Sequence, residues 1–415
     1  MAVSDACSGR AAAAWSVPLA GCLLLGCGPG PGAVPPLGNK GTPPVAVIPF
    51  DLYGGLVYVR GVVNRDSAWL ILDTGISRTG FDRAWAWTIG AVPLREPGAP
   101  AVQVAETVST ALVDTIRLEG LVLRDHPVAL YPLGGVSEVS GRPERGFVGH
   151  DVLRQFTLEI DYHERRVRLY DPARYRYAGS GAVVPFATDG DVPLLRGYVM
   201  VRGRRAIPAR LLLDTGASGL CLILTVPFVE RHDLARIVSP AIEAPIGTGL
   251  VGQLRGTIVR LEELRLGSVR VPFPTTGLGG ERKGFLARTD IDGVIGNPVF
   301  ENSRLTVEYS RRRVIVEQRA GAGARCDYDM SGLRLAARGP DLRHITVEYV
   351  VPHSPAADAG IRAGDELLLI DGRAVAAAPL SEVRQALHVV GAVRRLVLKR
   401  DADTIRVTLQ LRRLL

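Results

Sequence analysis

The most informative run in this chain is Leu211-Leu212-Leu213-Asp214-Thr215-Gly216-Ala217-Ser218. In it, an apolar run is followed by Asp214, Thr215 and Gly216, which place a carboxylate, a hydroxyl and a glycine at an expected sharp turn. The same arrangement stands earlier as Leu70-Ile71-Leu72-Asp73-Thr74-Gly75-Ile76-Ser77. Asp and Gly favour turns, so one copy has an ordinary structural explanation. Two copies, each at the end of an apolar strand, indicate one chemistry in which two aspartates come face to face.

The motifs around each copy also repeat in order. Gly146-Phe147-Val148-Gly149 returns as Gly293-Val294-Ile295-Gly296, 147 positions further along the chain. At the same offset, Asp161-Tyr162 matches Glu308-Tyr309. Runs that read as short strands surround these motifs in both copies. The sequence therefore predicts an internal duplication over residues 45–319, with two similar halves.

The paired Asp-Thr-Gly motifs resemble those of the pepsin and retropepsin aspartic proteases, in which each of two lobes gives one motif to a shared active site. The resemblance implies a mostly β fold: a bilobal acid-protease pair of β-barrels, with lobes at 45–177 and 178–319. It implies that Asp73 and Asp214 are the catalytic residues. It also implies that their neighbours support the pair, namely Thr74, Gly75, Ser77, Thr215, Gly216 and Ser218.

Each supporting residue has an expected role under this resemblance. The two threonines would brace the loops with hydroxyl-to-backbone hydrogen bonds, and the two serines would bond the outer carboxylate oxygens. The runs at 147–149 and 294–296 would pack beneath the aspartates. The glycines allow the backbone to turn tightly beside a carboxylate.

A glycine-rich stretch, Ile246–Gly252, resembles the flap of such an enzyme in the second lobe, with Gly247, Gly249 and Gly252 as its flexible positions. The first lobe offers only Gln103–Ser109, which holds no glycine, so one flap or two remain open. Ile76 stands where the family usually has a small residue, and it would crowd the first loop.

Two carboxylates within hydrogen-bonding reach can hydrolyse a peptide bond, because like charges that close do not both ionise readily. One takes a proton from a water molecule, and the other, protonated, polarises the scissile carbonyl. This chemistry needs no cofactor and no metal. Five histidines show no metal-ligand spacing and are interpreted as surface or cap residues: His150, His163, His232, His353 and His388.

The composition changes after a linker at 320–329. Ser354–Asp365 and Leu367–Gly372 resemble the signature of a PDZ domain, which implies a small α+β domain at 330–415. The resemblance implies that Gly332 and Leu333 offer backbone amides to a ligand's C-terminal carboxylate. The apolar spacing over 381–390 predicts the helix that lines the groove. Two interpretations stay open: a free peptide groove and a docked regulatory lid.

The first 27 residues read as an export signal. Leu19-Ala20-Gly21-Cys22 and Leu24-Leu25-Gly26-Cys27 both resemble the lipobox of bacterial lipoproteins, which implies lipidation at Cys22 or Cys27. A plain secretory peptide or an uncleaved anchor is the alternative. Residues 28–44 form a Pro/Gly-rich tether. The expected location is extracytoplasmic, with the chain lipid-anchored to a bacterial membrane.

The 415 residues carry a net charge of +8, and nearly all cations are arginine. No zinc-finger spacing or stacked aromatic pattern accompanies them, so nucleic acid is not an expected partner. Five cysteines are too few for a disulfide framework, and three of them lie in the first 27 residues. Cys221, on an apolar run, is interpreted as a small buried side chain rather than a reactive thiol.

Two functions of different classes fit these features. The first is an aspartic endopeptidase whose PDZ domain binds substrates or partners. The second is a non-catalytic lipoprotein that binds peptides, including C-terminal peptide ligands, through its PDZ groove. A serine protease with a PDZ domain is excluded, because no glycine-flanked serine appears with a paired His and Asp, and Gly296-Asn297-Pro298 lacks the serine.

Overall fold

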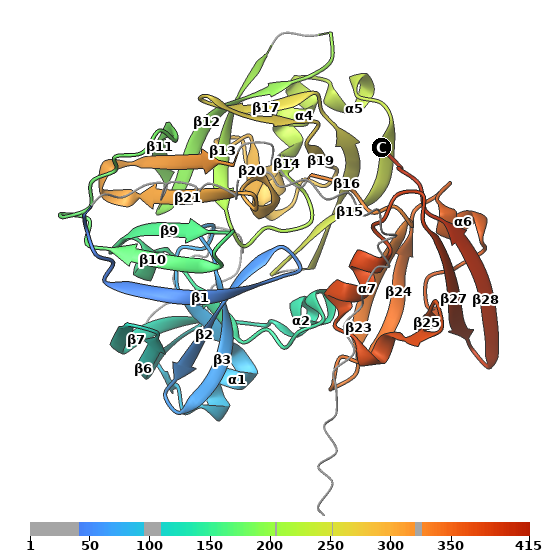
Figure 1. Ribbon diagram of the computed structural model, residues 1–415, viewed down its shortest axis with the longest axis horizontal. Helices are drawn as coiled ribbons and strands as arrows, with labels where there is room; N and C mark the ends of the chain where they lie inside the picture. Colours follow the sequence, from blue (N-terminus) through green and yellow to red (C-terminus); the bar gives the residue numbers. More distant parts are fainter. Residues whose placement is uncertain (1–40, 95–108, 204–205, 251, 320–325) are drawn as a thin grey trace, which may run out of the picture. The chain divides into compact units, whose positions relative to one another are not determined.

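The computed structural model describes residues 41–94, 109–203, 206–250, 252–319 and 326–415. All of these belong to one structural unit, Gly38–Leu415. Strands dominate it, and Figure 1 shows them in two β-rich halves and a separate C-terminal sheet. The leader, the lipobox cysteines and most of the tether lie outside the described residues.

The two halves share one antiparallel sheet of six strands (Figure 1). Its order is β1 (Ala46–Tyr53), β10 (Arg166–Tyr170), β9 (Thr157–Asp161), β21 (Ser303–Glu308), β22 (Arg313–Gln318) and β11 (Ala182–Asp189). The halves meet where β9 pairs with β21. There Glu159 lies opposite Thr306, and these two positions are 147 residues apart, the spacing of the predicted repeat. A pseudo-twofold axis therefore passes through this pair.

The rest of the first half folds around β2, β3 and β8. Its strands are β2 (Leu56–Val63), β3 (Asp66–Leu72), β4 (Gly80–Asp82), β5 (Val92–Pro93), β6 (Thr110–Leu118), β7 (Leu121–Tyr131) and β8 (Gly146–Val148). Its helices are α1 (Arg83–Thr88), α2 (Gly134–Ser140) and α3 (His150–Leu153). The hairpin β2–β3 turns at Asn64, whose φ is 52°, and leads directly into Asp73.

The second half repeats this arrangement. Its strands are β12 (Val192–Met200), β13 (Ile207–Asp214), β14 (Leu222–Leu224), β15 (Ala241–Gly249), β16 (Gly252–Arg260), β17 (Glu263–Leu266), β18 (Val269–Pro272), β19 (Thr275–Gly279) and β20 (Gly293–Gly296). Its helices are α4 (Val226–Arg231) and α5 (Leu234–Ile237). In both halves the strand before the aspartate runs parallel to the glycine-flanked strand: β3 beside β8, and β13 beside β20. One buried apolar cluster takes residues from both halves.

The C-terminal sheet has its own buried apolar cluster. It contains β23 (Leu333–Arg338), β24 (His344–Val350), β25 (Glu366–Ile370), β26 (Arg373–Ala374), β27 (Val393–Arg400) and β28 (Asp403–Gln410), with α6 (Pro355–Asp358) and α7 (Leu380–Ala386). The helix expected over 381–390 ends at Ala386, earlier than predicted. The chain turns at Gly391, whose φ is 77°, and Val390 is exposed rather than packed into the groove.

A buried ionic network lies on the shared sheet. Arg304 of β21 donates to Asp161 of β9 through Nη2 at 2.9 Å, and its Nη1 lies 3.6 Å from Glu317. Asp161 is 4% exposed and Glu317 is 6% exposed. Because buried carboxylates without a cation are strongly unfavourable, this arginine ties the two halves together.

We expect Arg304→Ala to lower the free energy of unfolding by about 3 kcal/mol, because it removes the cation nearest to Asp161 and Glu317 and leaves Asp161 only the more distant Arg168. Urea unfolding followed by far-UV circular dichroism measures the change. Arg166→Ala removes an exposed arginine from the same sheet and serves as the control. Equal midpoints for the two variants would contradict this account of the interface.

Candidate active site

The two Asp-Thr-Gly loops leave parallel strand pairs in the same way. Asp73 follows β3, and its N–H donates to the carbonyl of Val148 on β8 at 3.0 Å. Asp214 ends β13, opposite Gly296 of β20. The runs at 147–149 and 294–296 therefore lie beside the aspartate loops, as the sequence predicts. Both aspartates are 7% exposed.

The threonines of the two loops form a reciprocal brace. Thr74 Oγ1 donates to the carbonyl of Leu213 at 2.9 Å, and Thr215 Oγ1 donates to the carbonyl of Leu72 at 2.8 Å. Each hydroxyl also accepts from the backbone N–H of the opposite threonine at 3.1 Å. Both threonines are fully buried. Four hydrogen bonds thus hold together two loops that lie 141 residues apart in sequence.

The glycines of the two loops face the opposite carboxylates. A Cβ atom on Gly75 would lie 2.3 Å from Cγ of Asp214, and one on Gly216 would lie 2.3 Å from Oδ2 of Asp73. No larger residue fits at either position. The same glycines donate locally: Gly75 N–H to Asp73 Oδ1 at 2.7 Å, and Gly216 N–H to Asp214 Oδ1 at 2.8 Å.

The two carboxyl groups interact directly. Burial raises the pKa of Asp73 well above its ordinary value, and the charge of Asp214 and a hydrogen bond to its carboxyl raise it further. The N–H groups of Gly75 and Gly216 oppose this effect without cancelling it. The pair therefore holds a proton at a pH where an exposed aspartate is ionised.

The two serines do not take the expected role. In the part of the chain that the structure describes, neither the Ser77 nor the Ser218 hydroxyl bonds to an aspartate. The chain at Ser77 is fixed through its backbone, because its carbonyl accepts from Asp151 N–H at 3.1 Å. Ser218 instead lies next to Gly55 of the first half. A Cβ atom added to Gly55 would lie 3.2 Å from the Cβ of Ser218.

The flap candidate is a long hairpin, β15–β16, from the second half. Gly247, Gly249 and Gly252 lie towards its end, and Gly252 has a φ of 115°. Leu250 at the tip packs against an apolar cluster of the first half that includes Ile76. The hairpin thus reaches across to the apolar cluster beside the loop that carries Asp73, and Ile76 belongs to that cluster. The candidate stretch of the first half, 103–109, lies almost wholly outside the described residues.

The structure also reveals a polar network beneath Asp73 that the sequence did not suggest. Asp151 accepts from both the N–H and the hydroxyl of Thr79, each at 2.8 Å, and lies 3.0 Å from His126 Nε2. Thr79 in turn accepts from Gly149 N–H at 3.0 Å. These bonds lower the pKa of Asp151 despite its burial. The repeat could not signal this network, since Pro298 stands in the second half where Asp151 stands in the first.

His150 is not a surface residue, contrary to the prediction. It is 5% exposed, and its ring packs edge-on against Tyr309 with centroids 5.0 Å apart. Burial lowers its pKa. Its counterpart in the second half is Asn297, which accepts from the Tyr162 hydroxyl and donates to the Gly55 carbonyl. Each half thus places a polar residue against a tyrosine of the other.

Cys221 is fully buried, but it is not a free thiol. It forms a disulfide with Cys326, with Cα atoms 5.6 Å apart. Its burial is as predicted, but the sequence did not indicate the disulfide, because the partner lies 105 residues away, within the predicted linker at 320–329. The bond fastens the start of the C-terminal segment to β14.

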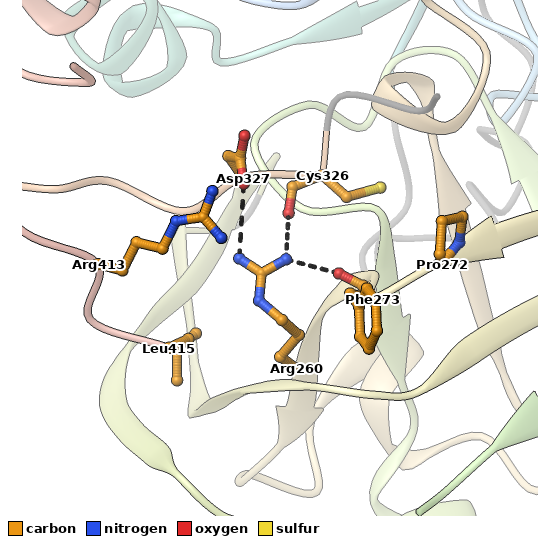
Figure 2. Close-up of a pocket in the computed structure, with 7 residues that line it drawn as sticks. All are labelled: Arg260, Pro272, Phe273, Cys326, Asp327, Arg413 and Leu415. Atoms are coloured by element: carbon orange, nitrogen blue, oxygen red, sulfur yellow. Dashed lines mark hydrogen bonds and ion pairs between the residues drawn. The ribbon is translucent and has the colours of Figure 1, made fainter. Parts of the chain in front are cut away.

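A cavity of about 390 Å³ lies at this junction (Figure 2). Inside it, the Arg260 guanidinium donates to the carbonyls of Phe273 and Cys326 and lies 3.8 Å from Asp327. None of the aspartate-loop residues lines it. Its lining is Arg260, Pro272, Phe273, Cys326, Asp327, Arg413 and Leu415.

Gly332 and Leu333 form a tight loop before β23, as a carboxylate-binding loop would. Gly332 has a φ of 81°, and a Cβ there would lie 2.1 Å from the side chain of Ser354, so only glycine fits. Both amides already have partners in the chain: Gly332 N–H donates to Asp329, and Leu333 N–H donates to Ser331 Oγ at 3.0 Å.

Among the described residues, no group of three His, Cys, Asp or Glu side chains is arranged to hold a metal ion. In the same part of the chain, no helix is both long and apolar enough to span a membrane.

We expect Thr74→Val to lower the free energy of unfolding by about 2–3 kcal/mol, because it leaves the Leu213 carbonyl and the Thr215 N–H buried without partners. Thermal unfolding measures the loss. Thr74→Ser keeps the hydroxyl and should retain most of the stability. If the serine variant were as unstable as the valine variant, lost packing rather than the brace would be responsible.

Comparison with known proteins identifies the C-terminal part. Residues 346–400 match the family described as PDZ domain. Among solved structures, the chain is similar to a photosystem II D1 C-terminal processing protease, at 28% identity and a TM-score of 0.19, over 20% of this chain and 22% of that one. The match therefore spans only about a fifth of that protease. No curated protein sequence matches the chain. The C-terminal sheet therefore contains a PDZ domain at residues 346–400.

Proposed function

We propose that this chain is an aspartic endopeptidase in which Asp73 and Asp214 activate one water molecule. The observation that carries the proposal is the pair of carboxyl groups, joined by a hydrogen bond and held by two symmetric loops. The six-stranded sheet and the parallel strand pairs in each half support it, since both relate the loops by one pseudo-twofold axis. The sequence resemblance to pepsin and retropepsin proteases points to the same chemistry.

The mechanism follows from the shared proton. In the resting pair one carboxyl is protonated and the other is ionised, because burial and mutual repulsion disfavour two charges. The ionised group takes a proton from the water as it attacks the peptide carbonyl, and the protonated group donates to the carbonyl oxygen. The tetrahedral intermediate then collapses when a carboxyl protonates the leaving amine. The brace matters because a small displacement of either carboxyl is costly in rate.

The flap hairpin completes the proposed site. Its tip residue Leu250 packs on the cluster that contains Ile76, close in sequence to Asp73. A hairpin that crosses from one half to the other can cover a bound peptide and exclude bulk water from the reacting groups. Gly247, Gly249 and Gly252 give it the freedom to open.

We expect Asp73→Asn and Asp214→Asn each to abolish cleavage of a fluorogenic peptide library, with a loss of at least about a thousandfold in kcat/KM. Asp114→Asn changes an exposed aspartate on β6 and should cleave like the wild type. The wild-type pH profile should be bell-shaped, and its alkaline limb should report the raised pKa of the pair. Undiminished cleavage by the Asp73→Asn/Asp214→Asn double variant would refute the proposal.

The raised pKa of Asp73 also gives a readout that needs no substrate. Because this pKa is higher in the folded chain than in the unfolded one, wild-type stability falls as pH rises from the ordinary aspartate range through the raised pKa. Asp73→Asn removes this loss. Within that pH range, its free energy of unfolding should gain on that of the wild type by up to about 1.4 kcal/mol for each pH unit. A constant difference across pH would mean that folding does not raise the pKa of Asp73.

A second candidate is a non-catalytic peptide-binding protein, and the PDZ match favours it. Binding through the PDZ groove would survive both aspartate substitutions and disappear when residues 330–415 are deleted. The aspartic endopeptidase explains more of the chain, because a binding protein gives no reason for the buried carboxyl pair.

For location, we propose export and lipid anchoring through Cys22 or Cys27, supported by the two lipobox-like sequences. Mass spectrometry of the mature N-terminus should find a diacylglyceryl cysteine at one of these positions. An unmodified residue other than cysteine at the mature N-terminus would contradict this proposal.

A further inference from the structure

The carboxylate-binding loop of the PDZ domain is occupied by a side chain of the same chain. The Asp329 carboxylate accepts from the N–H groups of Ser331, at 2.9 Å, and of Gly332, and from the Ser331 hydroxyl. One of these donors, the Gly332 N–H, is an amide that the resemblance assigns to a ligand's C-terminal carboxylate. Ser331 is fully buried, so water does not offer these donors an alternative. Asp329 therefore acts as an internal ligand.

The free edge of the groove is occupied as well. Strand β23 pairs with β24 on one side, which leaves its other edge, towards α7, for an added strand. There the Leu335 carbonyl accepts from Arg384 of α7 at 2.7 Å. The same Nη2 of Arg384 also donates to the Val139 carbonyl at 2.6 Å. Val139 belongs to α2 of the first half, so this arginine joins the groove to that helix.

Two further contacts place the end of α2 on the groove. Glu138 pairs with Arg338 of β23. A Cβ on Gly141, just after the helix, would lie 2.4 Å from Cβ of Leu380 at the start of α7. Helix α2 thus contacts both walls of the groove, the strand and the helix.

Helix α2 is fixed in the first half next to the flap. Arg142 lies over the rings of Tyr53 and Tyr58, at 4.1 Å and 4.8 Å from their centroids. Val136 of α2 packs on the apolar cluster on which Leu250 of the flap tip also packs. A displacement of α2 would therefore disturb the surface against which the flap rests.

The PDZ domain also bonds the flap directly. Arg334 of β23 donates to Thr248 Oγ1 at 2.6 Å, and the Tyr349 hydroxyl of β24 donates to the Glu243 carbonyl at 2.9 Å. Thr248 and Glu243 both belong to β15, the first strand of the flap hairpin.

We propose that the PDZ groove is closed by segments of its own chain, Asp329 at the loop and helix α2 along the walls, and that a peptide with a free C-terminal carboxylate displaces them and frees the flap. Regulation of cleavage by this displacement rests on the proposed endopeptidase function. The closure of the groove by its own chain is independent of that function. The proposal joins the two interpretations left open by the sequence: the groove is docked in the structure, and a free peptide can still displace the docked segments.

The contacts of α2 are suited to exchange. The helix has no fully buried residue, and the side chains of Glu138 and Arg338 are 38% and 39% exposed, so their ion pair is weak. A peptide that adds a strand to β23 offers backbone groups to its free edge and supplies its own carboxylate in place of that of Asp329.

Fluorescence polarisation with the full chain tests the proposal, in an Asp214→Asn background that prevents digestion of the probe. The probe is a pool of fluorescein-labelled decapeptides, randomised in the last four positions, with either a free carboxylate or a C-terminal amide. Glu138→Arg places like charges at the α2 contact and should tighten binding of the free-carboxylate pool about tenfold. Glu138→Arg/Arg338→Glu restores an ion pair and should restore the weaker affinity. The amide pool should not bind.

Asp329→Asn should also tighten binding, because it weakens the internal ligand, whereas Asp327→Asn, an exposed neighbour, should leave the affinity unchanged. Equal affinities in the parent, Glu138→Arg and Asp329→Asn chains would overturn the proposal, as would equal binding of the amide pool. With Asp214 intact, the free-carboxylate pool should stimulate cleavage of an internal peptide substrate. Tighter binding without cleavage in any variant would instead reject the endopeptidase function and leave the closed groove standing.

Discussion

The reciprocal threonine brace is the constraint on which the rest of the site depends. Each hydroxyl donates to the carbonyl that precedes the opposite aspartate, so neither aspartate loop can move without the other. The glycine that follows each threonine in sequence has no room for a side chain, because the carboxylate of the opposite loop occupies the space where its Cβ would be. The raised pKa of Asp73 is the electrostatic result of this geometry. Two groups that repel one another are kept close because four buried hydrogen bonds and a shared sheet oppose their separation.

Much of the candidate site could be predicted from the sequence because it is local and repeated. A strand ending in Asp-Thr-Gly, and a glycine-flanked strand 147 residues from its twin, specify the loops and their neighbours in both halves. The hairpin that leads to Asp73 and the tight turn at Gly332 follow from turn chemistry in the same way. What repeats in the sequence repeats in the structure.

What could not be predicted is the pairing of residues that no pattern links. The partner of Cys221 lies 105 residues away, and nothing near Cys326 announces it. The roles of Asp151 and His150 differ between halves, because Pro298 and Asn297 stand at the matching positions, so comparing the repeats hides them. The serines mislead for the opposite reason: their spacing fits the family, but backbone contacts direct them elsewhere. Occupation of the PDZ loop by Asp329 is local, through donors two and three residues further along the chain, but no pattern in the sequence pointed to Asp329.

The pairing of Glu159 with Thr306 limits what the first half could form as a separate chain. In an assembly of two identical first halves, the residue on the symmetry axis would face its own copy, and two buried glutamates would stand directly opposite each other. Arg304, which neutralises this region, would be missing, because Thr157 holds the corresponding place. Because both halves lie in one polypeptide, the position on their shared axis holds a different residue on each side, which a dimer of identical halves does not allow.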